Sequence, residues 1–203
     1  MITIVDYGMG NLGSVQNMFK KIGVSSKITS DKKELEQAEK ILLPGVGSFD
    51  SAMQKINTSG IREILDYKVL KQKVPILGIC LGMQLLTNNS EEGIEPGLGW
   101  INAKSKKFQL IKGDKLKIPH MGWNQTFPSR PSELTKDLPD ETRFYFVHSY
   151  YVEVDNEENS ILKTRYGVSF DSAIQADNIY GAQFHPEKSH KFGMKLFENF
   201  AKI

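Results

Sequence analysis

The chain has 203 residues, of which 39% are hydrophobic and 25% charged, so it can bury one sizeable core and resembles an ordinary globular domain in composition. Lysine and arginine outnumber aspartate and glutamate by only 26 to 24, and no basic block stands out, which argues against nucleic acid or an anionic membrane as a partner. The single cysteine excludes an internal disulfide, and we expect neither a signal peptide nor a membrane span, because the first residues lack a basic-then-apolar layout and the longest apolar run is too short. We therefore expect one domain, covering residues 1–203, in the reducing cytoplasm.

The first half of the chain alternates predicted strands with predicted helices. The strands are the apolar runs at residues 2–6, 26–29, 41–43 and 74–79. The helices are an apolar face over residues 12–22 that Gly23 can end, a segment from a capping box at Asp31 and Glu34 to residue 38, and helical patterns up to about residue 70. This alternation predicts right-handed crossovers in a parallel sheet covered on both faces, with functional sites at the carboxyl ends of its strands.

After about Trp100 the pattern changes to short strands and turns. Strands are predicted at residues 106–110, 144–148, 151–154, 161–165, 172–176 and 179–184, and a helix at residues 191–201. We find no linker, internal repeat or low-complexity segment. The predicted fold is therefore α/β, with a mostly parallel central sheet that is extended by an antiparallel or mixed portion.

The only cysteine, Cys80, lies between Gly78 and Gly82, after a strand-like run and before a helix-like one. This is the pattern of a nucleophile elbow, in which a tight strand-to-helix turn exposes the nucleophile and the glycines let neighbouring chain pass close to it. The free N–H groups at the start of the helix favour a thiolate. The alternative is that Cys80 is a small buried hydrophobic residue.

The best candidate for a general base is His185, which follows an apolar strand. Pro186 fixes the backbone so that Glu187, two positions on, can project to the same side and hold the imidazole. Cysteine, histidine and glutamate in this order have the logic of a catalytic triad; the alternative for His185 is a strand-end histidine bonded to a carbonyl. The other histidines, His148, His120 and His190, are weaker candidates and are expected to be structural or exposed.

An oxyanion site is predicted from backbone N–H groups. One donor would be the N–H of Leu81, directly after the nucleophile, and a second would come from the turn Pro44-Gly45-Val46-Gly47, near Val46 or Gly47. The alternative is that this turn only connects a strand to a helix.

Three motifs together resemble a known family. They are Pro44-Gly45-Val46-Gly47, the segment from Gly78 to Gln84, and His185-Pro186-Glu187-Lys188, and they look like those of the class I, or triad, glutamine amidotransferases. Two further segments, residues 6–11 and 119–124, resemble the glutaminase subunits of imidazole glycerol phosphate synthase in histidine biosynthesis. The resemblance implies a three-layer, flavodoxin-like fold and an activity that requires no metal or cofactor.

The resemblance also implies a role for each matching residue. Cys80 would attack the side-chain amide of L-glutamine to form a thioester, His185 would move the proton, and Glu187 would orient His185. Water would then release glutamate. The implied oxyanion residues are Val46, Gly47 and Leu81, with Val46 needing a backbone reorientation that responds to a partner. The glutamine pocket implied by the family consists of Gly47, Leu81, Gln84, Ser149 and Tyr150.

A partner is expected on chemical grounds, because ammonia released into neutral water becomes ammonium, which is not nucleophilic. This chain has no room for a second catalytic domain, so the acceptor site should lie on another polypeptide. The resemblance implies a heterodimer with a (β/α)8-barrel cyclase that makes imidazole glycerol phosphate and aminoimidazole carboxamide ribonucleotide. The residues matching that interface are Asn11, Met121, Trp123, Asn124 and Lys188. The alternatives are a core aromatic for Trp123 and a solvated charge for Lys188.

Three other functions stay open at this point. A paralogous glutaminase could feed ammonia to modified-sugar synthesis for surface polysaccharides, with the same chemistry and a related barrel partner. A catalytically silent binding or regulatory subunit could use the same fold, although an intact Cys80, His185 and Glu187 argues against it. Another α/β cysteine hydrolase, such as a peptidase, is the third; Gln84 and the segment His148-Ser149-Tyr150 favour a small amide substrate instead.

Overall fold

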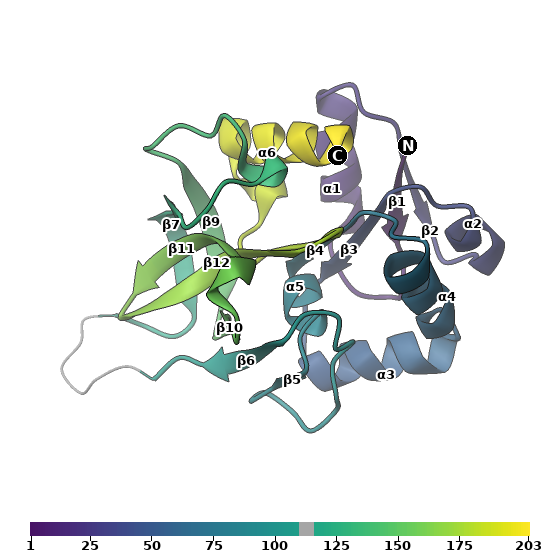
Figure 1. The fold of residues 1–203 in the computed structure, drawn as a ribbon, viewed down its shortest axis with the longest axis horizontal. Helices are drawn as coiled ribbons and strands as arrows, with labels where there is room; N and C mark the ends of the chain where they lie inside the picture. Colours follow the sequence, from purple (N-terminus) through teal and green to yellow (C-terminus); the bar gives the residue numbers. More distant parts are fainter. Residues whose placement is uncertain (110–115) are drawn as a thin grey trace.

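The computed structural model describes residues 1–109 and 116–203 (Figure 1). Its first half alternates strands and helices, as predicted. The elements are β1 (Ile2–Val5), α1 (Leu12–Lys21), β2 (Ser26–Thr29), α2 (Lys32–Glu36), β3 (Ile41–Gly45), α3 (Phe49–Ser59), α4 (Arg62–Asp66), a π-helical turn (Tyr67–Lys71), β4 (Ile76–Cys80) and α5 (Leu81–Leu85).

The second half is mostly short strands, followed by a C-terminal helix. The strands are β5 (Asn89–Ser90), β6 (Ala103–Lys107), β7 (His120–Gln125), β8 (Phe127–Pro128), β9 (Arg143–His148), β10 (Tyr150–Val154), β11 (Ser160–Tyr166), β12 (Val168–Ala176) and β13 (Ile179–Ala182). Short 3₁₀ turns are present at Glu133–Thr135, Glu157–Asn159 and Pro186–Lys188, and the last helix is α6 (His190–Lys202).

The main sheet has the strand order β2-β1-β3-β4-β13-β12-β10-β6-β5. The neighbours from β2 to β13 pair in parallel, whereas β12 is antiparallel to β13, β10 to β12 and β6 to β10. Strands β7 and β9 form a separate antiparallel pair. The predicted fold, a mostly parallel sheet with an antiparallel extension, is therefore confirmed.

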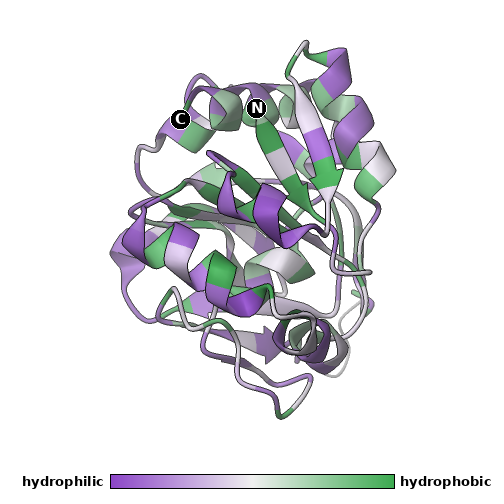
Figure 2. Cartoon of the chain, turned by 90° about the vertical axis from the view of Figure 1, so that its right-hand side faces the viewer, coloured by the Kyte–Doolittle hydropathy of each residue, from purple (hydrophilic) through white to green (hydrophobic). Residues whose placement is uncertain are grey.

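Helices cover both faces of the parallel strands, so the molecule has three layers (Figure 1). Side chains alternate across each strand: Ile4 of β1 enters the core under α1 and α6, and its neighbour Val5 enters the core under α2 to α5. The first core includes the Phe19 and Phe197 rings of α1 and α6, whose centroids are 4.5 Å apart. Figure 2 shows hydrophilic and hydrophobic residues banded along the helices, as amphipathic covering helices require.

Local sequence explains where the first helices begin. The side chain of Asn11 accepts a hydrogen bond from the Ser14 N–H at 3.4 Å at the start of α1, and that of Asp31 accepts one from the Glu34 N–H at 3.0 Å at the start of α2. Helix α2 ends at Glu36, two residues earlier than predicted. The helical pattern that was expected to reach residue 70 is interrupted at Gly60, whose φ of 71° ends α3.

Several strands differ from their predicted positions. The strand expected at residues 106–110 is β6, which begins at Ala103 and ends at Lys107; Leu110 lies outside the described residues. Strand β12 begins four residues earlier than predicted and β13 ends two residues earlier. Strand β7 was not predicted, because its alternating residues include Gly122 and polar side chains rather than an apolar face.

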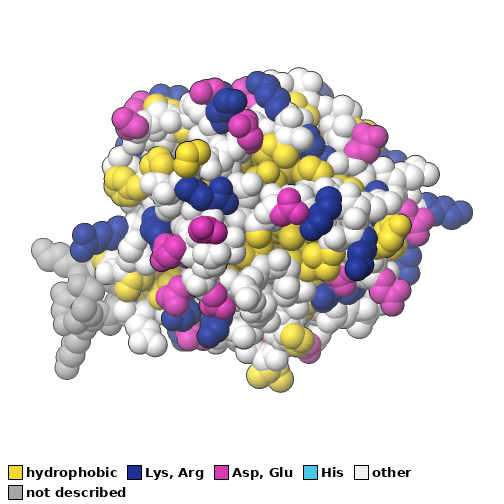
Figure 3. Space-filling model, viewed as in Figure 1, with side chains coloured by type: hydrophobic (Ala, Val, Ile, Leu, Met, Phe, Trp, Pro, Cys, Tyr) yellow, Lys and Arg dark blue, Asp and Glu magenta, His cyan; other side chains and the backbone are white. Residues whose placement is uncertain are grey.

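In the part of the chain that the structure describes, no helix combines the length and the apolar character that crossing a bilayer requires. Figure 3 shows acidic and basic side chains interspersed over the face seen there, without a block of one sign. This distribution agrees with the near balance of 26 basic and 24 acidic residues.

Candidate active site

Cys80 forms the turn between β4 and α5 with φ 55° and ψ −111°, a conformation that side-chain-bearing residues rarely adopt. The flanking glycines are required by close packing. A Cβ on Gly78 would lie 2.6 Å from the Gly82 carbonyl oxygen, and a Cβ on Gly82 would lie 2.0 Å from the Leu43 carbonyl oxygen of β3. The predicted elbow is thus present, with a strained residue held by its surroundings, and strain of this kind is typical of functional sites.

Gly82→Ala is expected to destabilise the fold by about 3 kcal/mol, because the methyl group collides with backbone rather than with a movable side chain. Gly13→Ala is the matched control: Gly13 is also the second residue of its helix, but nothing lies within 4 Å of its added Cβ. The control should stabilise the protein by about 0.5 kcal/mol through helix propensity. Urea unfolding of both variants measures the difference, and equal effects would contradict the close packing at the elbow.

His185 and Glu187 come from the turn that follows β13. The His185 Nδ1 and Glu187 Oε1 atoms are 2.7 Å apart, and both side chains are almost fully buried. The hydroxyl of Ser189 donates to the His185 carbonyl at 2.6 Å and so fixes the turn from behind. Gly193 of α6 lets the helix approach this turn, because a Cβ there would lie 1.8 Å from the Pro186 carbonyl oxygen. The structure therefore places the histidine and the acid as the sequence predicts.

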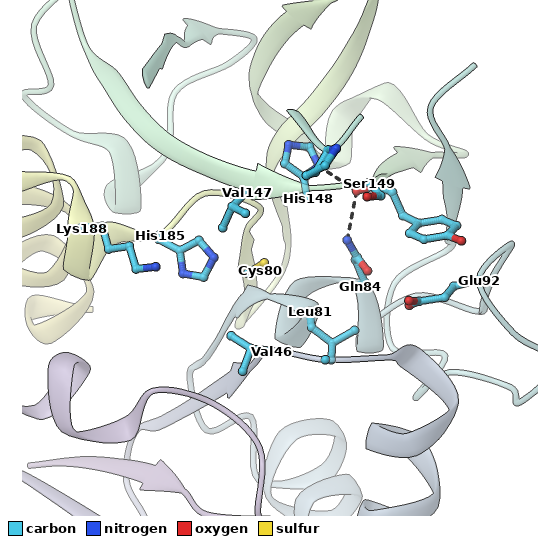
Figure 4. A pocket seen from close by; sticks show the side chains of 13 residues that line it. Val46, Cys80, Leu81, Gln84, Glu92, Val147, His148, Ser149, His185 and Lys188 are labelled. Atoms are coloured by element: carbon cyan, nitrogen blue, oxygen red, sulfur yellow. Dashed lines mark hydrogen bonds between the residues drawn. The ribbon is translucent and has the colours of Figure 1, made fainter. Parts of the chain in front are cut away.

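The charge state of His185 is set by its neighbours. Burial by itself lowers the pKa of His185, but the Cys80 side chain and the Glu187 carboxylate raise it, and the balance leaves the pKa at about 10. The ring lies beside Cys80 in Figure 4, and its Nε2 atom is buried without a hydrogen-bond partner among the described residues. An imidazolium at this place can balance a thiolate and can later donate a proton.

Two glutamines connect the nucleophile to the pocket wall. The Gln183 Nε2 atom donates to Cys80 Sγ at 3.9 Å, and Gln84 Nε2 donates to Gln183 Oε1 at 3.1 Å and to the Tyr150 carbonyl at 3.1 Å. Since both amide hydrogens of Gln84 are used, its Oε1 atom is the one left for the cavity. Sequence reasoning missed Gln183, although its position two residues before His185 could have indicated it.

A cavity of about 380 Å³ opens at the nucleophile (Figure 4), a size suited to a small ligand. The predicted site residues that line it are Val46, Gly47, Cys80, Leu81, Gln84, Ser149, Tyr150, His185 and Lys188. Four residues that the sequence did not single out as pocket residues line it as well: Glu92, Pro119, Val147 and His148. The Glu92 carboxylate accepts a hydrogen bond from the Phe49 N–H at 2.9 Å and gives the cavity an acidic wall.

The turn after β3 is packed from the side of β1. The Tyr7 hydroxyl donates to the Pro44 carbonyl at 2.7 Å, and burial, together with negative charge at Cys80, raises the pKa of Tyr7 above its usual value. Gly47 has φ +113°, and a Cβ there would lie 2.6 Å from the Met9 methyl group. Val46 is 44% exposed. The conformation of this turn thus depends on the segment that contains Tyr7 and Met9.

The predicted partner residues lie outside the core. Met121 is 61% exposed and Trp123 43%, so the core-aromatic alternative for Trp123 is wrong. The Trp123 indole stacks on the His190 ring with the centroids 5.6 Å apart. Lys188 is exposed, lines the cavity and holds its Nζ atom 5.6 Å from the centre of the Tyr145 ring.

The other two predicted interface residues, Asn11 and Asn124, form hydrogen bonds within the chain. Asn11 caps α1, and the Asn124 amide lies 3.2 Å from His120 Nε2 and donates to the Arg165 carbonyl at 3.0 Å. Within residues 1–109 and 116–203, no group of three or more histidine, cysteine, aspartate or glutamate side chains could hold a metal ion.

The fold and this site define a class of protein. A family model described as "Glutamine amidotransferase class-I" matches residues 3–203. Solved structures agree in fold: a glutamine amidotransferase at TM-score 0.75 and 17% identity, covering 100% of both chains, and PurLQS from Thermotoga maritima at TM-score 0.73 and 17% identity, covering 99% of this chain and 97% of that one. The chain belongs to the class I glutamine amidotransferases, which take nitrogen from glutamine.

Curated relatives narrow the family further. "Imidazole glycerol phosphate synthase subunit HisH 2" of Methanococcus maripaludis is 56% identical over 100% of this chain and 99% of that protein. The subunit of the same name from Pseudomonas aeruginosa is 47% identical, and subunit HisH of Bdellovibrio bacteriovorus 48% identical, each over 100% of both chains. Within its class the chain therefore belongs to the HisH subunits of imidazole glycerol phosphate synthase, and such a subunit works with a partner subunit.

Proposed function

We propose that this chain hydrolyses L-glutamine to glutamate and ammonia with Cys80 as nucleophile, His185 as proton carrier and Glu187 as the group that orients His185. The observation that carries the proposal is that Cys80 and His185, from two separate segments, line one cavity of about 380 Å³, while Glu187 lies against His185 Nδ1 at 2.7 Å. In the first step the thiolate attacks the amide carbon and the imidazolium donates its proton to the departing ammonia. In the second step His185 takes a proton from water, which attacks the thioester and releases glutamate.

Glutamine recognition is assigned to groups on the cavity wall. The Glu92 carboxylate suits the α-ammonium group of the substrate, and the Gln84 Oε1 atom offers a second acceptor. Gly47, Leu81, Ser149 and Tyr150 complete the pocket. The tetrahedral oxyanion would be stabilised by the N–H of Leu81 and by an N–H near Val46 or Gly47, with Val46 turning its N–H inward when the partner docks.

We assign the partner to a (β/α)8-barrel cyclase that consumes the ammonia to make imidazole glycerol phosphate and aminoimidazole carboxamide ribonucleotide. The names of the HisH relatives support a partner subunit, and the exposed Met121 and Trp123 offer apolar contacts for it. Asn11, Asn124 and Lys188 complete the proposed interface. The cytoplasm is the proposed compartment, because a thiolate nucleophile must stay reduced.

A glutaminase assay of the chain, alone and with a co-expressed cyclase barrel plus its formimino nucleotide substrate, tests the proposal. We expect turnover to rise strongly only when both are present, and Trp123→Ala to weaken that activation. Tyr67→Ala is the matched control, since Tyr67 is an aromatic residue that is 57% exposed on the π-helical turn, outside the proposed interface. Glutaminase activity that does not change when the barrel and its nucleotide are added would overturn the histidine-pathway assignment.

A second candidate is supply of ammonia to modified-sugar synthesis through a related barrel partner. The relatives from Methanococcus maripaludis and Pseudomonas aeruginosa are both designated HisH 2, a number that implies a second such subunit in each organism. Growth of a deletion strain without histidine separates the two candidates: a histidine requirement supports the synthase, and normal growth with altered surface polysaccharide supports the sugar pathway.

A further inference from the structure

Two buried histidines outside the proposed triad face each other across the β7–β9 pair. His120 and His148 are directly opposite in the strand register, and His120 Nδ1 lies 2.9 Å from His148 Nε2. Their exposed fractions are 2% and 6%. The His120 ring is stacked between Phe146 and Tyr166, with centroid distances of 4.8 Å and 4.0 Å. Neither ring takes part in the chemistry assigned above.

The hydrogen-bond partners fix the proton positions on both rings. His148 Nδ1 lies 2.7 Å from the Tyr150 carbonyl, which can only accept, so His148 carries its proton on Nδ1. Burial lowers the pKa of His148 to about 3 and that of His120 to about 4, so both rings are neutral near pH 7. The bare Nε2 of His148 therefore accepts from His120 Nδ1–H, and the bare Nε2 of His120 accepts from the Asn124 amide at 3.2 Å.

The other bonds of the series agree with these proton positions. Asn124 uses its second amide hydrogen on the Arg165 carbonyl at 3.0 Å, so exchanging its amide nitrogen and oxygen would set acceptor against acceptor at both places. At the other end, the Tyr150 carbonyl accepts hydrogen bonds from both Gln84 and His148. From Gln84 the bonds continue through Gln183 to Cys80. One hydrogen-bonded series thus joins the nucleophile to the edge of β7.

We propose that His120 is a positioning residue for glutamine binding: by donating to His148 it fixes the tautomer of His148, which holds the Tyr150 carbonyl in the wall of the glutamine pocket. His148 lines the cavity and His120 lies behind it, so His120 acts through His148. Without the His120 donor, the buried His148 Nε2 would lose its partner, and the ring could reverse its tautomer and release the carbonyl. The Tyr150 peptide and the Gln84 amide would then lose their fixed orientation.

This inference rests on the proposed glutaminase function, and glutamine affinity is the readout. Binding is measured by calorimetry in the full-length Cys80→Ala chain, which cannot turn glutamine over. His120→Phe keeps a ring between Phe146 and Tyr166 but removes both nitrogens, and His120→Asn keeps an N–H donor at the Nδ1 position but loses the ring. We expect His120→Phe to raise the glutamine Kd about tenfold, the effect of one unmade buried hydrogen bond, and His120→Asn to stay near the parent.

The reverse order, with His120→Asn impaired and His120→Phe normal, would mean that ring packing is what matters and would overturn the proposal, as would two unchanged affinities. A second measurement does not depend on glutamine. Imidazole ¹⁵N NMR of the unsubstituted chain should report protonated Nδ1 and bare Nε2 on both rings between pH 6 and 8, and a protonated His148 Nε2 would also overturn the proposal. If the Cys80→Ala parent fails to bind glutamine, the proposed function fails, and the NMR result still decides the tautomer assignment.

Discussion

Replacing Cys80 with alanine is expected to abolish glutamine hydrolysis while leaving the protein folded. Loss of a catalytic nucleophile typically costs on the order of 10⁶-fold in kcat, since the remaining groups have nothing to form a thioester with. The fold should survive because alanine fits the volume and keeps the same backbone. The measurement is glutamate release by the complex with the proposed barrel partner, alongside thermal unfolding of the variant. Full turnover in Cys80→Ala would end the enzyme hypothesis.

A glycine at the same position separates strain from chemistry. The φ of 55° and ψ of −111° at Cys80 suit glycine but not alanine or cysteine. Cys80→Gly should be as inactive as Cys80→Ala and yet more stable by about 1 kcal/mol, the lower end of the strain stored at such residues. Equal stability of the two variants would contradict a strained elbow.

Glu187→Gln is expected to lower kcat by roughly 10³- to 10⁴-fold, the range seen when the acid of a triad becomes an amide and the imidazole takes the wrong tautomer. The side chain keeps its size, and only the charge next to His185 Nδ1, at 2.7 Å, is removed. Glu133→Gln is the matched control, because that carboxylate is 70% exposed and pairs with Lys136 on the surface. The control should have wild-type kcat.

The same variant tests the charge balance at His185 through pH. Cys80 and Glu187 together hold the pKa of His185 at about 10 against the lowering effect of burial. Removing the Glu187 charge should lower that pKa, so the alkaline limb of the kcat profile should move to lower pH. A histidine in the unfolded chain has a pKa of about 6.5, so the raised value stabilises the fold fully below that pH, and this contribution is lost as the pH rises through about 10. An unmoved alkaline limb would contradict the role given to Glu187.

Sequence periodicity predicted the parallel half of the sheet better than the rest. Strands such as β3 and β4 are buried on both faces, and their apolar runs stand out against amphipathic helices. Strand β7 has no such signal: only His120 is buried, Gly122 interrupts the run, and the strand pairs with β9 outside the main sheet. Strand β7 forms only by pairing with β9, where Gly122 lies opposite Phe146, more than twenty residues further along the chain. No local pattern encodes such a pairing.

The candidate site likewise contains residues that local motifs predict and residues that only tertiary contacts bring into place. Cys80, His185 and Glu187 could be predicted because each lies in a short motif whose backbone requirements are local: glycines for the elbow and Pro186 for the turn. Glu92 could not, since a glutamate in a loop has no special spacing, and Gln183 is indicated only by its position two residues before His185. Gln183 reaches Cys80 because β13 pairs with β4, and Glu92 lines the cavity because the loop after β5 packs on the start of α3.

The sequence by itself determined the alternating strands and helices of the first half, the elbow at Cys80 and the candidate reacting groups, because these depend on residues within a few positions of one another. The tertiary structure alone decided how those groups are held. It sets the pKa of His185 through burial and two charges, packs Met9 against Gly47, and joins Cys80 to Asn124 through hydrogen bonds that converge on the Tyr150 carbonyl. Burial and hydrogen-bond direction arise only when distant segments meet, so no single stretch of sequence contains them.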